Sequence, residues 1–121
     1  MPKSYRDLVV WQRSVDLAEL TYRLTRAFPK EELYGLAAQM RRASVSVASN
    51  IAEGSARSRG DFHRYVVMAR GSNNELQTQL VIAQRLGFGD QQIRDNLESL
   101  SEEVGRSLTK FADYLRRSDT A

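Results

Sequence analysis

The sequence predicts an all-α protein, an antiparallel up-down four-helix bundle formed by one domain that spans residues 1–121. Apolar residues recur at helical spacing over four long segments. The breaks between these segments are short, and no segment has the alternating pattern of a β-strand. We therefore expect helices at about 5–27, 33–57, 60–86 and 91–117, joined by short connections as in simple bundles.

The segment at about 5–27 has apolar residues on more of its circumference than a peripheral bundle helix needs. One stripe contains Leu8, Trp11, Val15, Ala18 and Tyr22. The other stripe contains Val10, Leu17, Leu20 and Leu24. Phe28 is expected to end the helix, because the proline that follows disfavours the α conformation of the residue before it. The carboxylates of Glu31 and Glu32 suit the first turn of the next helix.

The segment at about 33–57 also has two apolar sides. Its core stripe contains Leu36, Met40, Ala43, Val47 and Ile51, and its second strip contains Ala38, Val45, Ala48, Ala52 and Ala56. Because a helix at the surface of a monomer needs only one apolar face, we expect the surplus faces of the first two helices to form a subunit interface. The predicted interface residues are Val10, Leu17, Leu20, Leu24, Val45, Ala48, Ala52 and Ala56.

Polar residues mark the ends of the last two helices. Ser58 with Asp61 three residues later is a variant of the capping box, which predicts the start of the third helix. Gly71 lies in the middle of that helix, and we expect close packing or a local irregularity there. The fourth helix has one narrow apolar stripe, as an outer bundle helix does. That stripe contains Ile93, Leu97, Leu100, Val104, Leu108, Phe111 and Leu115.

The residue types present argue against catalysis and against a cofactor. The chain has no cysteine and a single histidine, His63, so thiol chemistry, thiolate metal sites and an acyl-transfer triad have no candidates. It has no Glu-x-x-His pair for a di-metal bundle site and no glycine-rich phosphate loop. No segment is long enough to span a membrane. We therefore expect a cytoplasmic protein that is not an enzyme and binds no cofactor.

The positive charge is concentrated in the middle of the chain. The net charge is +3, and between residues 36 and 70 six arginines face only Glu53 and Asp61. Arginine suits phosphate oxygens, so we predict that these side chains contact nucleic acid. The alternative is an unevenly charged but solvated surface, with Glu53 paired to Arg57 or Arg42 within a structural network. The predicted contacts are Arg41, Arg42, Arg57, Arg59, Arg64 and Arg70.

A series of short motifs resembles the bacterial 23S rRNA intervening-sequence proteins. The series covers nearly the whole chain, with small departures at Met40, Val47 and Phe88-Gly89. Its members are Leu8–Gln12, Phe28–Glu32, Tyr34–Leu36, Gln39–Ala43, Asn50–Gly54, Gly71-Ser72, Glu75-Leu76 and Gln79-Leu80.

This resemblance implies a four-helix bundle that assembles into a homopentameric ring. It also implies kinship with the accessory variability determinant of diversity-generating retroelements, a basic pentamer that binds nucleic acid and a reverse transcriptase. No catalytic residues are known for the family, so none is carried over to this chain. The leading hypothesis is therefore a ring-forming protein that binds RNA or DNA. The alternatives are a protein-interaction scaffold without nucleic-acid binding and, more remotely, a carrier of a hydrophobic small molecule.

Overall fold

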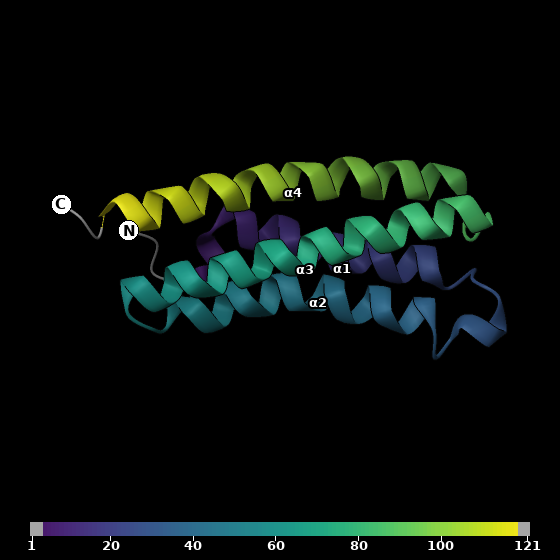
Figure 1. The fold of residues 1–121 in the computed structure, drawn as a ribbon, viewed down its shortest axis with the longest axis horizontal. Helices are drawn as coiled ribbons and strands as arrows, with labels where there is room; N and C mark the ends of the chain where they lie inside the picture. Colours follow the sequence, from purple (N-terminus) through teal and green to yellow (C-terminus); the bar gives the residue numbers. More distant parts are fainter. Residues whose placement is uncertain (1–3, 119–121) are drawn as a thin grey trace.

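The computed structural model describes residues 4–118, and its helices form the predicted antiparallel four-helix bundle (Figure 1). The long helices run alternately up and down, and each connection joins neighbouring helices at one end of the bundle. Two short 3₁₀ helices, η1 and η2, precede α1 and α2. The elements are η1 (Tyr5–Asp7), α1 (Val9–Thr25), η2 (Lys30–Glu32), α2 (Leu36–Ser55), α3 (Arg59–Leu86) and α4 (Gln91–Ser118).

The helices enclose one apolar core that runs the length of the bundle. Each helix packs on its neighbours in sequence, and α1 closes the bundle against α4. The predicted core stripes of α2 and α4 are confirmed, because Met40, Ile51, Leu97 and Leu108 are fully buried. Gly71 corrects one prediction: it is exposed, with nothing within 4 Å of an added Cβ, and α3 continues through it without a break.

The structure buries half of the subunit interface that was predicted on α1. Leu17 and Leu24 are fully buried in the core of their own chain, which removes both from the predicted interface. Val10 and Leu20 are partly buried against the same core. Of the other stripe, Val15 and Tyr22 are each 40% exposed.

Small hydroxyl residues explain why the buried side of α1 differs from the predicted one. Ser14, Thr21 and Thr25 share the buried side of α1, although the hydropathy pattern gives them no weight. Each hydroxyl donates to a carbonyl one turn earlier in the same helix, with the oxygens of Ser14 and Val10 separated by 2.7 Å and those of Thr21 and Leu17 by 2.8 Å. A hydroxyl satisfied in this way can enter the core at little cost.

Side-chain caps fix the ends of the helices. The acidic residues that were expected in the first turn of the second helix lie instead in η2, which precedes α2. From there the Glu32 carboxylate accepts a hydrogen bond from the Leu36 N–H at 3.1 Å and so caps the first turn of α2. The Ser58 hydroxyl accepts from the Asp61 N–H, which confirms the predicted cap of α3. Gly87 ends α3 with a φ of 71°, a left-handed conformation that favours glycine.

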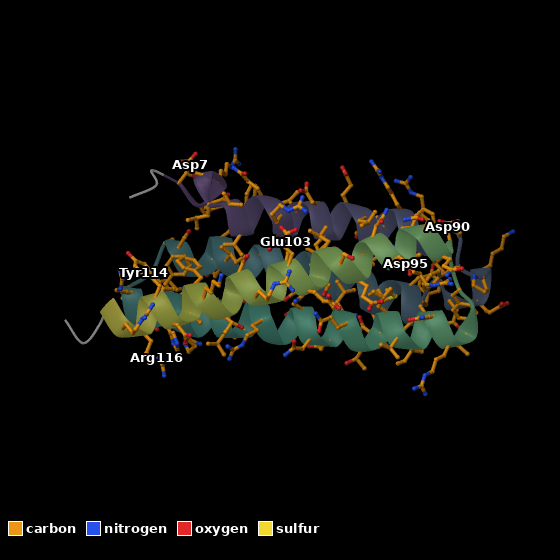
Figure 2. The ribbon with its side chains drawn as sticks, turned by 90° about the horizontal axis from the view of Figure 1, so that it is seen from above. Asp7, Asp90, Asp95, Glu103, Tyr114 and Arg116 are labelled. Carbon is orange, nitrogen blue, oxygen red and sulfur yellow. The ribbon has the colours of Figure 1, made fainter. Side chains whose placement is uncertain are left out.

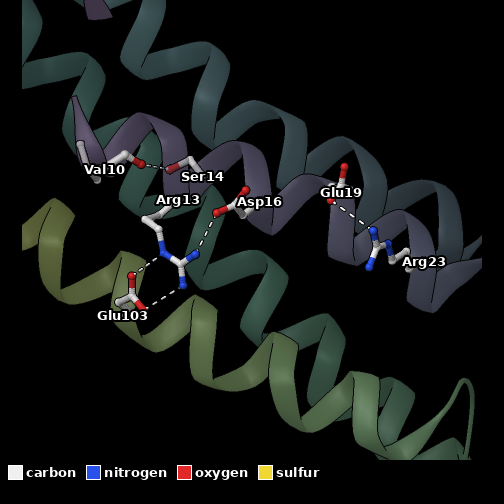
Figure 3. A network of polar contacts seen from close by, with 7 residues as sticks. All are labelled: Val10, Arg13, Ser14, Asp16, Glu19, Arg23 and Glu103. Atoms are coloured by element: carbon white, nitrogen blue, oxygen red, sulfur yellow. Dashed lines mark hydrogen bonds and ion pairs between the residues drawn. The ribbon is translucent and has the colours of Figure 1, made fainter. Parts of the chain in front are cut away.

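An ion pair joins α1 to α4 at the bundle surface (Figure 3). Arg13 donates from Nε to the Glu103 carboxylate at 2.7 Å and from a second nitrogen at 3.1 Å. Its third nitrogen bonds Asp16 on the same helix at 2.8 Å. The hydrogen bond from Arg13 lowers the pKa of Glu103 below its ordinary value, and the same bond raises the pKa of Arg13.

Candidate nucleic-acid interface

The six predicted arginine contacts lie in three separate places. Arg41 and Arg42 lie near the start of α2, beside the end of α1, whereas Arg57, Arg59 and Arg64 surround the junction between α2 and α3. A helical rise of 1.5 Å per residue separates Arg42 from the end of α2 by about 20 Å. Arg70 lies further along α3, on the side that faces α4. The structure therefore does not gather the six arginines into one patch.

Arg41 is committed to the contact between α1 and α2. Its Nε donates to the Thr25 hydroxyl at 2.9 Å, and its guanidinium lies 4.9 Å from the centroid of the Tyr22 ring. Arg42 is exposed beside it, in a shallow concavity that also contains Tyr34 and Val45. The described lining of this surface is largely apolar.

The arginines at the α2–α3 junction contact aromatic rings. The guanidinium carbons of Arg57 and Arg64 each lie 4.9 Å from the centroid of the Tyr65 ring. Arg57 also donates to Glu53 at 2.6 Å, which confirms the predicted helical ion pair and raises the pKa of Arg57. Arg59 lies over the Tyr114 ring of α4 at 4.8 Å. These contacts fix the arginines in place at one end of the bundle.

Arg70 belongs to a basic groove between α3 and α4. Arg106 and Lys110 of α4 line the same groove, and the only acidic side chain among its described lining residues is Glu102. None of the three cations makes a side-chain hydrogen bond or an ion pair within residues 4–118, unlike Arg13 or Arg57. Asn74, Gln77, Gly105 and Thr109 complete the lining.

A close approach of α3 and α4 shapes the floor of this groove. The buried Asn73 amide donates to the Ser101 carbonyl oxygen at 2.9 Å, and the Ser101 hydroxyl donates back to the amide oxygen at 2.8 Å. A Cβ added at Gly105 would lie 3.1 Å from the Asn73 amide nitrogen. The missing side chain at Gly105, which also lines the groove, therefore lets the two helices pack closely.

The sequence predicted a contact at Arg70 but did not single out Arg106 and Lys110, which line the same groove. The second half of the chain is acidic overall, with six basic and eight acidic residues after residue 70, so no patch was predicted there. The missed signal is the spacing of four residues between Arg106 and Lys110, which places both on the same side of α4. Their pairing with Arg70 depends on the register of two helices, which helical spacing alone does not give.

Exposed apolar side chains form two further groups. Tyr22, Leu33, Tyr34 and Val45 line one concavity on the α1–α2 side, and Tyr34 is 92% exposed. Of the predicted interface residues of α2, Val45 and Ala56 are exposed and Ala48 and Ala52 are partly buried. A second group on α3 consists of Met68, Ile82 and Leu86, whose spacings of 14 and 4 residues place them on one side of that helix.

The described residues offer no arrangement for a metal ion or for a membrane span. Within residues 4–118, no three histidine or acidic side chains come together as metal ligands would. No described helix is both long and apolar enough to cross a bilayer. The chemistry that the arrangement does support is electrostatic binding of an anionic polymer along the groove between α3 and α4.

Comparisons with known proteins identify the family and the fold. The model of the 23S rRNA-intervening sequence protein family matches residues 6–110. A crystal structure of a protein of unknown function from the S23 ribosomal protein family of Bacteroides thetaiotaomicron aligns with a TM-score of 0.79 and 22% identity. The alignment covers 86% of this chain and 98% of that one, and at this identity it shows the fold alone. No curated protein matches the chain.

Proposed function

The chain belongs to the 23S rRNA-intervening sequence protein family, and we propose that it is a non-enzymatic protein that binds nucleic acid and assembles into a ring. The observation that carries the proposal is the groove between α3 and α4. There, three cations that make no side-chain hydrogen bond or close ion pair within residues 4–118 line one groove beside a close contact between two helices. Phosphate groups would give these cations hydrogen-bonded charge partners, which residues 4–118 do not supply.

The groove suits contact with the sugar-phosphate backbone rather than with bases. None of its described lining residues is aromatic, so it offers no surface for base stacking. Arg70 and Arg106 can each bind a phosphate with two N–H groups, and Lys110 adds a point charge. Binding of this kind is independent of sequence and weakens as the salt concentration rises.

Two different apolar surfaces support the ring. The concavity with Tyr22, Tyr34 and Val45 lies on the α1–α2 side, whereas Met68, Ile82 and Leu86 follow α3. A contact between unlike surfaces of identical subunits is heterologous, and it forms a ring when the rotation between successive subunits closes. A ring repeats the basic groove once in every subunit, so individually weak phosphate contacts add up to a higher avidity.

The binding proposal is tested by a variant that neutralises the groove. Arg70→Gln, Arg106→Gln and Lys110→Gln together should weaken the binding of a fluorescently labelled 20-base-pair DNA, measured by anisotropy at low salt, by at least about 100-fold. The matched control is Arg23→Gln, Arg26→Gln and Arg85→Gln, which removes the same charge from exposed sites outside the groove. Equal affinity of the two triple variants would overturn the proposed site.

The ring proposal is tested by light scattering after nuclease treatment. The 13.8 kDa chain should elute as a homo-oligomer whose mass is a multiple of that value, with a pentamer favoured by the family resemblance. Tyr34→Ser on the α1–α2 side should shift the protein towards the monomer without lowering its helix content, because Tyr34 is almost fully exposed. A monomer in the unmodified protein would reject the ring.

A protein-interaction scaffold remains the second candidate function, supported by Arg41. Its hydrogen bond to Thr25 and its contact with the Tyr22 ring hold Arg41 within its own chain, at the edge of an exposed apolar concavity that another protein could cover. The scaffold hypothesis predicts an intact oligomer that does not retain nucleic acid at low salt. Retention that disappears in the groove variant while the oligomer persists would reject it.

A further inference from the structure

A cavity of about 630 Å³ lies at the end of the bundle where η1, the α2–α3 junction and the last turns of α4 meet. This volume is in the range of small-molecule sites. Four of its ten described lining residues are aromatic, and three of these are in contact. Phe62 and Phe111 pack edge to face at 5.2 Å, and the Tyr114 ring stacks on Phe111 at 6.4 Å. Tyr5, Leu8 and Leu115 add further apolar surface.

Among the described residues that line the cavity, the charged side chains are all positive. Arg57 and Arg59 line it, and none of its described lining residues is acidic. Only one nitrogen of Arg57 donates to Glu53, so its other N–H groups remain available to bind a ligand. The hydroxyl-bearing residues Ser4 and Ser55 also line the cavity. Figure 2 shows that Tyr114 and Arg116 project to opposite sides of the end of α4, so the cavity and the outer surface of this helix are distinct.

Stacked Tyr and Phe rings beside guanidinium groups fit a flat anion. An aromatic ring lies favourably against Phe62 and Phe111, and a carboxylate or phosphate accepts charge-assisted hydrogen bonds from arginine. We propose that this cavity binds a small ligand with a planar aromatic ring and one anionic group. The site is separate from the α3–α4 groove and shares no lining residue with it.

Isothermal titration calorimetry on the full chain tests the proposal with three probes. They are 2-naphthoate, adenosine monophosphate and, as the uncharged counterpart, 2-naphthalenemethanol. We expect an anionic probe to bind with a stoichiometry of one molecule per chain. The alcohol should bind at least about tenfold more weakly, because it loses one charge-assisted hydrogen bond. Tighter binding of 2-naphthoate identifies an aromatic carboxylate as the ligand class, and tighter binding of the nucleotide identifies a phosphate monoester.

Two single variants separate the site from general charge. Arg57→Gln should weaken the binding of the anionic probe by about tenfold, because it removes a charged donor from the cavity wall. Arg64→Gln is the control, since Arg64 contacts the same Tyr65 ring but does not line the cavity. Because Arg57 is exposed, its variant should keep the fold, which a thermal melt verifies. Absence of saturable binding, equal affinity for the alcohol, or equal losses in the two variants would each overturn the proposal.

Discussion

Asn73 of α3 and Ser101 of α4 exchange two hydrogen bonds in the core of the bundle, and both residues are fully buried. The amide donates to a backbone carbonyl and accepts from a hydroxyl, so its donor and its acceptor are each paired at 2.8–2.9 Å. This reciprocal contact fixes the register of the two helices that carry Arg70, Arg106 and Lys110.

Removal of one partner should leave the other unsatisfied in the core. We expect Asn73→Ala and Ser101→Ala each to lower the free energy of unfolding by about 1–3 kcal/mol. In the double variant the losses should be less than additive, with a coupling of about 1 kcal/mol, measured by urea denaturation. Asn74→Ala is the control, because its exposed side chain should change stability by less than about 0.5 kcal/mol. Strict additivity of the two single variants would contradict the reciprocal bond.

The close contact of Gly54 with Tyr65 should make a methyl group added at Gly54 destabilising. A Cβ at Gly54 would lie 2.6 Å from the Tyr65 Cβ, an atom that side-chain rotation does not move, so α2 and α3 must separate. We expect Gly54→Ala to lower the free energy of unfolding by about 1–3 kcal/mol despite the higher helix propensity of alanine.

Gly71→Ala provides the matched comparison in the same measurement. No atom lies within 4 Å of an added Cβ there, so only the helix propensity should change. We expect this variant to gain up to about 1 kcal/mol of stability. Equal effects of the two alanine substitutions would show that packing at Gly54 is not tight.

The ion pair between Glu103 and Arg13 should make stability depend on acid pH. The pKa of Glu103 is lowered by the hydrogen bond from Arg13, so the contribution is complete above the ordinary value of 4.5 and is lost as the pH falls through the lowered pKa. Both side chains are about half exposed, so the pair should contribute at most about 1 kcal/mol.

A comparison with Glu103→Gln measures this contribution. The unmodified protein should be the more stable of the two at pH 7, and the difference should shrink as the pH falls below 4.5 and through the lowered pKa of Glu103. Glu98→Gln is the control, since the Glu98 side chain makes no ion pair within residues 4–118. A constant difference between pH 7 and pH 3 would contradict the assignment.

Helical periodicity predicted the bundle because each of its helices has a stripe long enough to define a face. The stripe of α4 from Ile93 to Leu115 is the clearest case, and every member is buried or packs against the core. The family was also predictable, because the motif series from Leu8 to Leu80 is specific. The cap at Ser58 was predictable from local sequence, because it depends only on two residues three positions apart.

The faces of α1 and the basic groove were not predictable in the same way. Thr21 and Ser14 occupy core positions because their hydroxyls bond their own helix, a contact invisible to hydropathy. Arg70 meets Arg106 and Lys110 only through the packing of α3 on α4, which the buried pair of Asn73 and Ser101 sets. Hydrophobic periodicity predicts the buried face of a single helix, whereas a groove between two helices also depends on how they pack against each other.

The salt dependence of DNA binding tests the central claim most directly. The logarithm of the association constant should fall linearly with the logarithm of the salt concentration, and neutralising Arg70, Arg106 and Lys110 together should make the slope shallower by about 0.9 for each phosphate contact removed. The control variant with Arg23, Arg26 and Arg85 neutralised should keep the slope of the unmodified protein. Equal slopes in all three proteins, or no binding at low salt, would contradict the claim that the α3–α4 groove binds nucleic acid.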